Sequence, residues 1–184
     1  MRYFLGFLIA IGLLALVIIL VVKNLGNNPT GPQPKALYTY GNTDAVAGLL
    51  ISGPVVADQN YQQIQINISQ SVSQINIING YNGTVVNTRI FANNQSAYSA
   101  FLGALQGNGF ALGDSNYKYK TPSGFCSFGN SYSYSLTSSN KTIFNYWATS
   151  CGGQGNFKGI VGNVNSLFES QIPNYSTIIG NTSL

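Results

Sequence analysis

The stretch YQQIQINISQSVSQINIINGYNGTVVNTRIF, residues 61–91, decides the fold class. Ile64, Ile66 and Ile68 alternate with polar residues, and a period of two is typical of a strand with one buried face. The segments SQINIING and TVVNTRIF flank Asn82-Gly83, a pair that tolerates the positive φ of a tight hairpin turn. The stretch therefore predicts antiparallel strands joined by a hairpin, and the apolar run AGLLISGPVVA before it predicts another strand.

A change of period after residue 92 predicts a helix. Asn93 or Asn94 can cap its start, and Gly107 fits a C-terminal cap. Four apolar residues fall at i, i+3, i+4 and i+7 on one helical face: Tyr98, Phe101, Leu102 and Leu105.

The second half of the chain shows the same succession. SYSYSLTSSNKTIFNYWATS, residues 131–150, predicts two strands around a Ser-Ser-Asn-Lys turn. Helical spacing follows in residues 160–168, with Pro173 as the stop. A strand pair followed by a helix, found twice, predicts an α+β domain of two layers, with an antiparallel sheet and two helices on one face.

The N-terminus has the features of a membrane anchor. Residues 3–22 contain no charged side chain, and a helix of that length at ~1.5 Å per residue spans about 30 Å, the thickness of the hydrocarbon core. The apolar core is longer than that of a cleaved signal peptide, and no small-x-small site follows it. We therefore expect a transmembrane signal-anchor at 1–23, a flexible Gly/Pro/Asn-rich linker at 24–35 and an extracytoplasmic domain at 36–184.

Two cysteines indicate one disulfide. Cys126 precedes the first strand of the second expected hairpin and Cys151 follows its second strand, so strand pairing brings them together. We expect Ser133 to lie near Ile143 in this hairpin, and Trp147 to pack over the disulfide in the core. Because disulfides persist in oxidising compartments, the pair favours a cytoplasmic N-terminus and an exported domain in a single-pass membrane protein. Positive charges near the apolar segment are nearly balanced and do not decide the orientation.

The composition excludes several kinds of chemistry. The 184 residues contain no histidine and only four carboxylates, so His-dependent triads and a zinc cage are ruled out. The glycine-rich segment GGQGNFKG matches neither dinucleotide nor P-loop spacing. We expect no catalytic residue, no metal site and no cofactor.

Eight basic residues give a net charge of +4, but they are scattered. NYKYK, residues 116–120, places aromatics beside two lysines, which is too few for a nucleic-acid site, and no nucleic acid is expected as a partner. The expected partners are the lipid bilayer, through residues 3–22, and a protein at the cell surface. Uncharged tyrosine-rich surfaces make good contact patches, and four residues are candidates for one: Tyr117, Tyr119, Tyr132 and Tyr134.

The last sixty or so residues resemble small membrane-anchored exported proteins of ultrasmall candidate-phylum bacteria (Saccharibacteria-like lineages). The shared elements are the aromatic strand SYSYSL, the W-x-T-S-C-G turn at 147–152 and the L-F-x-x-Q-I-P-x-Y ending at 167–175. The resemblance implies a location and an architecture, and it implies no activity.

These observations predict a membrane-anchored extracytoplasmic domain that binds a partner or joins an envelope assembly without catalysis. A pilin-like filament subunit is one alternative, although the prepilin cleavage motif and an early glutamate are missing. The other is a cell-envelope enzyme without histidine or metal. It would use a Ser, Tyr or Lys nucleophile with Asp114 or Glu169, and Lys141 or Lys158 would serve as its base.

Overall fold

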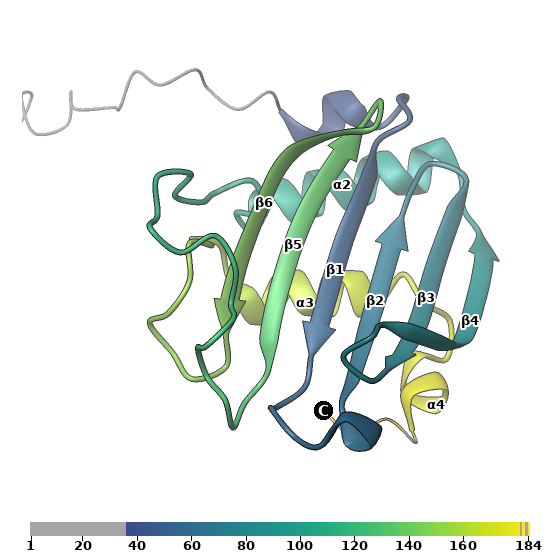
Figure 1. Cartoon of the computed structure of the whole chain (residues 1–184). Coiled ribbons are helices and arrows are strands. Elements are labelled where there is room, and N and C mark those ends of the chain that lie inside the picture. The colour runs from purple at the N-terminus through teal and green to yellow at the C-terminus, as the bar shows by residue number, and fades with distance from the viewer. Residues whose placement is uncertain (1–35, 181, 183) are drawn as a thin grey trace, which may run out of the picture. The chain divides into compact units, whose positions relative to one another are not determined.

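The computed structural model describes residues 36–180, 182 and 184, and its main element is one antiparallel sheet of six strands in the order β4-β3-β2-β1-β5-β6 (Figure 1). The strands are β1 (Val46–Ser52), β2 (Gln62–Ile68), β3 (Val72–Asn79), β4 (Thr84–Ala92), β5 (Ser131–Ser138) and β6 (Lys141–Thr149). The helices are α2 (Gln95–Gly107), α3 (Val161–Glu169) and α4 (Tyr175–Ile179), with the 3-10 turns η1 (Leu37–Tyr40) and η2 (Asp58–Asn60).

The fold class expected from the sequence needs correction. The described chain is mostly an antiparallel six-stranded sheet with few helices. The sequence predicted instead a two-layer α+β domain behind a membrane helix, with a strand pair followed by a helix occurring twice. Four strands precede α2 and only two follow it, because β1 and β2 come before the β3–β4 hairpin and join it in the same sheet. The second hairpin extends that sheet by pairing β5 with β1, so the two halves are not equivalent.

Among the described residues, no helix is both long enough and apolar enough to cross a bilayer. The expected membrane helix at 3–22 and the expected linker at 24–35 lie outside the described part of the chain. The signal-anchor therefore stays a prediction.

Alternation of side chains gives the sheet one apolar face. Ile64, Ile66 and Ile68 of β2 are fully buried, as the period of two predicted, and they pair with Ile77, Ile75 and Ser73 of β3. Helices α2 and α3 lie behind the strands in the view of Figure 1. The buried face of α2 is the predicted one, formed by Tyr98, Phe101, Leu102 and Leu105.

Aromatic rings join the helices to the sheet. Phe101 of α2 meets Phe168 of α3 edge-on, with centroids 5.2 Å apart, and Phe110 contacts Phe168 at 5.5 Å and Tyr134 of β5 at 6.2 Å. The Tyr98 hydroxyl donates a hydrogen bond of 2.9 Å to the carbonyl of Ala45. Burial of such rings supplies much of the apolar driving force for folding.

Both hairpin turns predicted from the sequence are present. The β3–β4 turn has Gly83 at φ +74°, and Ser139 and Asn140 at the β5–β6 turn have φ of +51° and +59°. The register of the second hairpin differs from expectation, because Ser133 lies opposite Trp147 and not near Ile143. Its turn is held by Asp44, which accepts hydrogen bonds from Ser138 Oγ (2.7 Å) and the Ser139 N–H (2.8 Å).

Candidate binding groove on the open face of the sheet

The face of the sheet turned away from α2 and α3 carries uncharged polar side chains in cross-strand rows, and Figure 1 views the sheet from this side. One row runs Asn67–Gly48–Ser135–Asn145 across β2, β1, β5 and β6. The next runs Asn76–Gln65–Leu50–Ser133–Trp147 from β3 to β6. Neither row contains a charged residue, because serine, asparagine and glutamine alternate with the buried apolar residues along these strands.

A shallow groove crosses this face. A depression of about 250 Å³ has Gly48 at its floor and Asn67, Ser133, Ser135 and Asn145 around it. A second depression of about 380 Å³ lies between residues 121–126 and two tyrosines, Tyr61 and Tyr81, and includes Ser52, Gln63 and Ser131. The two depressions share Leu50 and Ser133, so we treat them as one feature, the open-face groove.

Gly48 keeps the floor of the groove open. A Cβ at this position would lie 2.7 Å from Ser135 Oγ and 3.3 Å from Asn67 Oδ1. Any larger residue would therefore displace these polar groups and fill the space above the strand.

Two stacked tyrosines form one wall. The rings of Tyr61 and Tyr81 are 3.9 Å apart and inclined by 14°. The Tyr81 hydroxyl donates to the Val56 carbonyl at 2.9 Å, and the Tyr81 N–H donates to Asp58 Oδ1 at 2.7 Å. These contacts hold a flat aromatic surface that is still 53% exposed at Tyr81.

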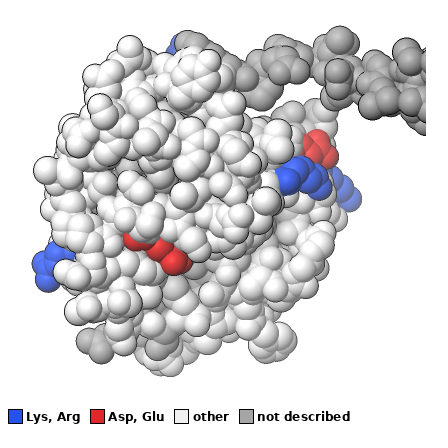
Figure 2. Space-filling model, turned by 180° about the vertical axis from the view of Figure 1, so that it is seen from behind, with Lys and Arg blue, Asp and Glu red and all other residues white. Residues whose placement is uncertain are grey.

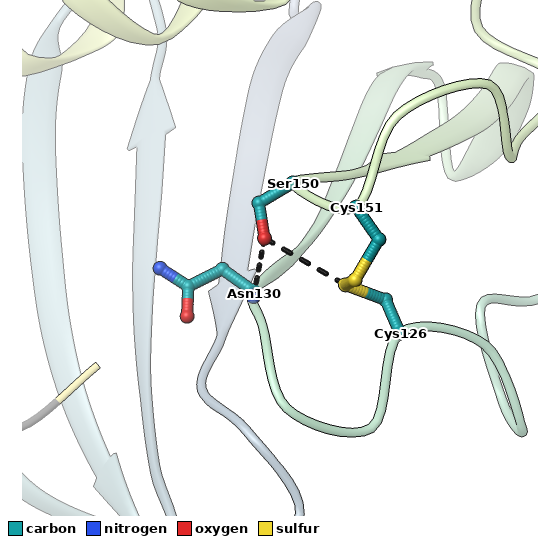
Figure 3. The surroundings of a disulfide bond; sticks show 4 residues. All are labelled: Cys126, Asn130, Ser150 and Cys151. Carbon is teal, nitrogen blue, oxygen red and sulfur yellow. Dashed lines mark hydrogen bonds between the residues drawn. A yellow bond between two sulfur atoms is a disulfide. The ribbon is translucent and has the colours of Figure 1, made fainter.

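The opposite wall belongs to a loop fastened by the disulfide. Cys126 and Cys151 are bonded, with their Cα atoms 5.6 Å apart, so the predicted pairing is confirmed (Figure 3). Ser150 Oγ accepts a hydrogen bond of 2.9 Å from the Asn130 N–H and lies 3.7 Å from Cys126 Sγ. Cys126 is itself part of the groove lining, so the disulfide fixes this wall directly.

Trp147 packs under the same loop. It is 1% exposed, and its Nε1 donates a hydrogen bond of 3.0 Å to the Tyr119 carbonyl. The rings of Phe125 and Tyr117 lie 5.2 and 6.0 Å from it. Trp147 is thus buried on the open face and not between the sheet and the helices, and Phe125, next to Cys126, links it to the disulfide.

The structure divides the four tyrosines expected to form a contact patch. Tyr117 and Tyr119 are in the loop over Trp147, whereas Tyr132 and Tyr134 belong to β5 and pack on the helix side of the sheet. Tyr134 is fully buried, and its hydroxyl donates a hydrogen bond of 2.8 Å to Asn165 Oδ1. Tyr134 therefore cannot belong to the exposed contact patch that the sequence suggested. Burial also raises the pKa of Tyr134 above its usual range.

The polar groups of the groove fall into two sets. Some are already paired: Gln63 Nε2 donates to Ser52 Oγ at 2.8 Å, and Asn76 Nδ2 donates to Gln65 Oε1 at 3.0 Å. Within the described part of the chain, four other side chains on the groove make no hydrogen bond: Asn67, Ser133, Ser135 and Asn145. Amides and hydroxyls both donate and accept, so these four can serve a ligand without breaking a contact of the fold.

No Asp or Glu side chain lines any of four depressions in the described part of the chain, including the two of the open-face groove. Asp58 holds the Tyr81 turn, and Asp114 Oδ1 accepts a hydrogen bond of 2.9 Å from the Asn116 N–H. The hydrogen bonds from Ser138 and Ser139 lower the pKa of Asp44. Burial raises the pKa of Glu169 at the end of α3.

Charged groups are sparse on the helix side as well, where Figure 2 shows only a few small patches of Lys, Arg, Asp and Glu. Among the described residues, no three Asp, Glu, Cys or His side chains gather in a way that could hold a metal ion.

Comparison of the sequence with protein-family models and with curated proteins found no match. The groove itself was not predicted from the sequence, because its lining comes from four strands and three connecting segments that are distant in the chain. The one local signal was tyrosine placement: Tyr61 directly precedes the alternating strand, and Tyr81 opens the Asn-Gly turn.

Proposed function

We propose that the chain is a membrane-anchored protein whose extracytoplasmic domain binds an uncharged polar partner in the cell envelope, without catalysis, through the open-face groove. The observation that carries this proposal is the groove lining, in which tyrosines, amides and hydroxyls occur without a single charged side chain. A charged partner would lose its hydration there without gaining an opposite charge, whereas an uncharged polar partner finds hydrogen-bonding groups.

The location is supported by two features of the chain. The Cys126–Cys151 disulfide is a bond that persists in oxidising compartments outside the cytoplasm. The uninterrupted apolar stretch at 3–22 has the length of a membrane-spanning helix. Both fit a single-pass protein with a cytoplasmic N-terminus.

A binding role is favoured over an enzymatic one by the positions of the carboxylates. Asp44, Asp58 and Asp114 accept hydrogen bonds from backbone N–H groups of turns, and none of them reaches a depression. A general acid or base must lie within hydrogen-bond reach of its substrate. Among the described residues that line the groove, there is no Asp, Glu or Lys side chain that could take this role.

The location can be tested with a membrane-impermeant amine reagent on intact cells expressing the full chain. We expect labelling of Lys118 and Lys158, both exposed on the domain, and retention of the chain in membranes after alkaline washing. Lysines that become labelled only after cells are permeabilised would place the domain in the cytoplasm and contradict the proposal.

Binding can be tested with the purified full chain in detergent and isolated cell envelopes. Asn145→Asp adds a charge to the groove at an exposed position with almost no change of shape, and we expect it to weaken envelope binding about tenfold or more. Asn42→Asp is the matched control, because Asn42 is exposed outside the groove and makes no side-chain hydrogen bond. Equal binding by the wild type and Asn145→Asp would rule out the groove as the site.

A further inference from the structure

We infer that the ligand of the open-face groove is a neutral oligosaccharide. This inference rests on the proposed function and names the chemical class of the partner. It is carried by three properties of the groove that coincide: a stacked tyrosine wall, unpaired amides and hydroxyls, and the absence of charge from the lining.

The unpaired groups match the chemistry of sugar hydroxyls. A sugar hydroxyl donates one hydrogen bond and accepts others, so it is best met by groups that also do both. Asn67 and Asn145 each offer two amide donors and an acceptor, and Ser133 and Ser135 lie between them on the same or the next row. No partner within the described residues competes for these four side chains.

The tyrosine wall supplies the apolar half of the match. The face of an aromatic ring carries partial negative charge, and the C–H bonds on one side of a sugar ring present partial positive charge to it. Tyr61 and Tyr81 are nearly parallel at 3.9 Å, and the hydrogen bond from the Tyr81 hydroxyl to the Val56 carbonyl anchors the outer end of the Tyr81 side chain. A flat ring that is fixed before binding loses little entropy when a ligand stacks on it.

A length of sugar chain fits the groove better than one sugar unit. The two depressions of about 380 and 250 Å³ lie next to each other and share Leu50 and Ser133 in their linings. The tyrosines border the first depression, and Asn67 and Asn145 border the second. A ligand that uses both sets of groups must therefore extend across β1 and β5.

An uncharged peptide is the competing ligand, and the position of the groove disfavours it. Peptides commonly bind to sheets by adding a strand to a free edge, where main-chain hydrogen bonds supply the affinity. The groove lies on the face of β1, which is paired on both sides with β2 and β5. Its backbone groups are already used, and only side chains are available to the ligand.

The test uses the full chain in a detergent without a sugar headgroup, titrated with neutral hexasaccharides of glucose, mannose and N-acetylglucosamine. We expect at least one of them to bind, and a hexasaccharide of galacturonic acid not to bind. Asn67→Ala and Asn145→Ala should each weaken binding about fivefold to tenfold, because each removes hydrogen bonds to the ligand. Asn42→Ala should leave the affinity unchanged.

Gly48→Ala gives a second measurement that removes no hydrogen-bonding group. The added methyl group would occupy the groove floor 2.7 Å from Ser135 Oγ, so this hydroxyl must rotate away. We expect affinity to fall while the melting temperature stays close to that of the wild type, because only a side-chain atom has to move. Failure of every neutral sugar to bind, or binding that is indifferent to Asn67→Ala and Asn145→Ala, would overturn the inference. A Ser/Asn-rich peptide that binds in place of the sugars would do the same.

The two proposals can fail separately. If envelope binding is lost in Asn145→Asp but no neutral sugar competes for it, the groove is a binding site and the ligand class is wrong. If a sugar binds the groove but envelopes do not, the ligand class stands and the envelope is the wrong location for the partner.

Discussion

Thr149, on the open face of the sheet, has a buried hydroxyl group that lowers the stability of the fold. It is 7% exposed at the end of β6, and its hydroxyl makes no hydrogen bond within the described part of the chain. A buried hydroxyl without a partner costs about 1–3 kcal/mol, because water is removed from it and nothing replaces that water.

Thr149→Val should therefore raise the free energy of unfolding by about 1 kcal/mol. Thr142→Val is the matched control on the same strand; Thr142 is exposed, so its change should stay within about 0.5 kcal/mol. Chemical denaturation of both variants measures the difference. A destabilised Thr149→Val would mean that the hydroxyl has a partner, such as a bound water.

Glu169 gives the stability a dependence on pH. Burial raises its pKa above the ordinary value of 4.5, and burial followed by the charge of Glu169 raises the pKa of Tyr175. The folded chain thus holds the Glu169 proton more tightly than the unfolded chain does. The contribution of Glu169 to the free energy of unfolding is most favourable below the pKa that this residue has in the unfolded chain. It is lost as the pH rises through the pKa of Glu169 in the folded chain.

Glu169→Gln removes this dependence. We expect the variant and the wild type to have similar melting temperatures below pH 4.5, and the variant to become the more stable one as the pH rises. The difference between the two proteins is the quantity to measure, because the lowered pKa of Asp44 acts in the opposite direction in both of them. A difference that does not change with pH would show that Glu169 is equally hydrated in both states.

At the scale of elements, the loop over the groove depends on the disulfide more than on secondary structure. No helix or strand lies between α2 and β5. The loop is attached through the Cys126–Cys151 bond, the hydrogen bond from Val55 N–H to the Ser127 carbonyl (2.8 Å) and the packing of Phe125 on Trp147.

The double variant Cys126→Ser/Cys151→Ser should unfold about 3 kcal/mol more easily, since the bond closes a loop with a sequence separation of 25. This corresponds to a fall in melting temperature of roughly 10 °C for a domain of this size. We also expect weaker binding in the groove, because one wall loses its attachment. Reduction of the wild type is the internal control and should reproduce the shift, whereas free thiols in the unreduced protein would contradict the bond.

Strands and helices with a clear hydrophobic periodicity could be predicted from the sequence, but the order in which the strands pair could not. The period of two at Ile64–Ile66–Ile68 and the helical spacing from Tyr98 to Leu105 depend on neighbours in the sequence, so local physics fixes them. The pairing of β5 with β1 joins residues such as Leu49 and Tyr134, which no local pattern connects. Tyr134 was expected on the surface for that reason, although this pairing turns it toward the helices.

The disulfide was the one long-range contact open to prediction, because two cysteines allow only one intramolecular pair. Its effect on the candidate site was not predictable. The groove appears only when β1 is placed between β2 and β5, since its floor is Gly48 and its sides come from both neighbours.

At the scale of the molecule, the two edges of the sheet differ. Beside β6, the segment at 155–157 covers the edge: Trp147 N–H donates to Asn156 Oδ1 at 2.7 Å, and Phe157 N–H donates to the Trp147 carbonyl at 3.0 Å. At β4, a bulge at Val86 and the charge of Arg89 interrupt the regular edge. Such devices protect sheet edges from pairing with other chains, so the addition of a strand at either edge is disfavoured.

The low charge of the molecule leads to a prediction about salt. Binding through an uncharged groove replaces water-mediated contacts by hydrogen bonds and stacking, and salt screens neither of these strongly. We expect the affinity for envelopes to change less than about twofold between about 0.05 and about 0.5 M sodium chloride, whereas a protein that binds phosphates loses affinity by a factor of about 10³ or more over a similar range. Melting temperatures over the same range provide the control for folding. A steep loss of binding with salt would mean that scattered lysines, such as Lys118 and Lys120 in the loop between α2 and β5, bind an anionic partner. The groove would then not be the main contact.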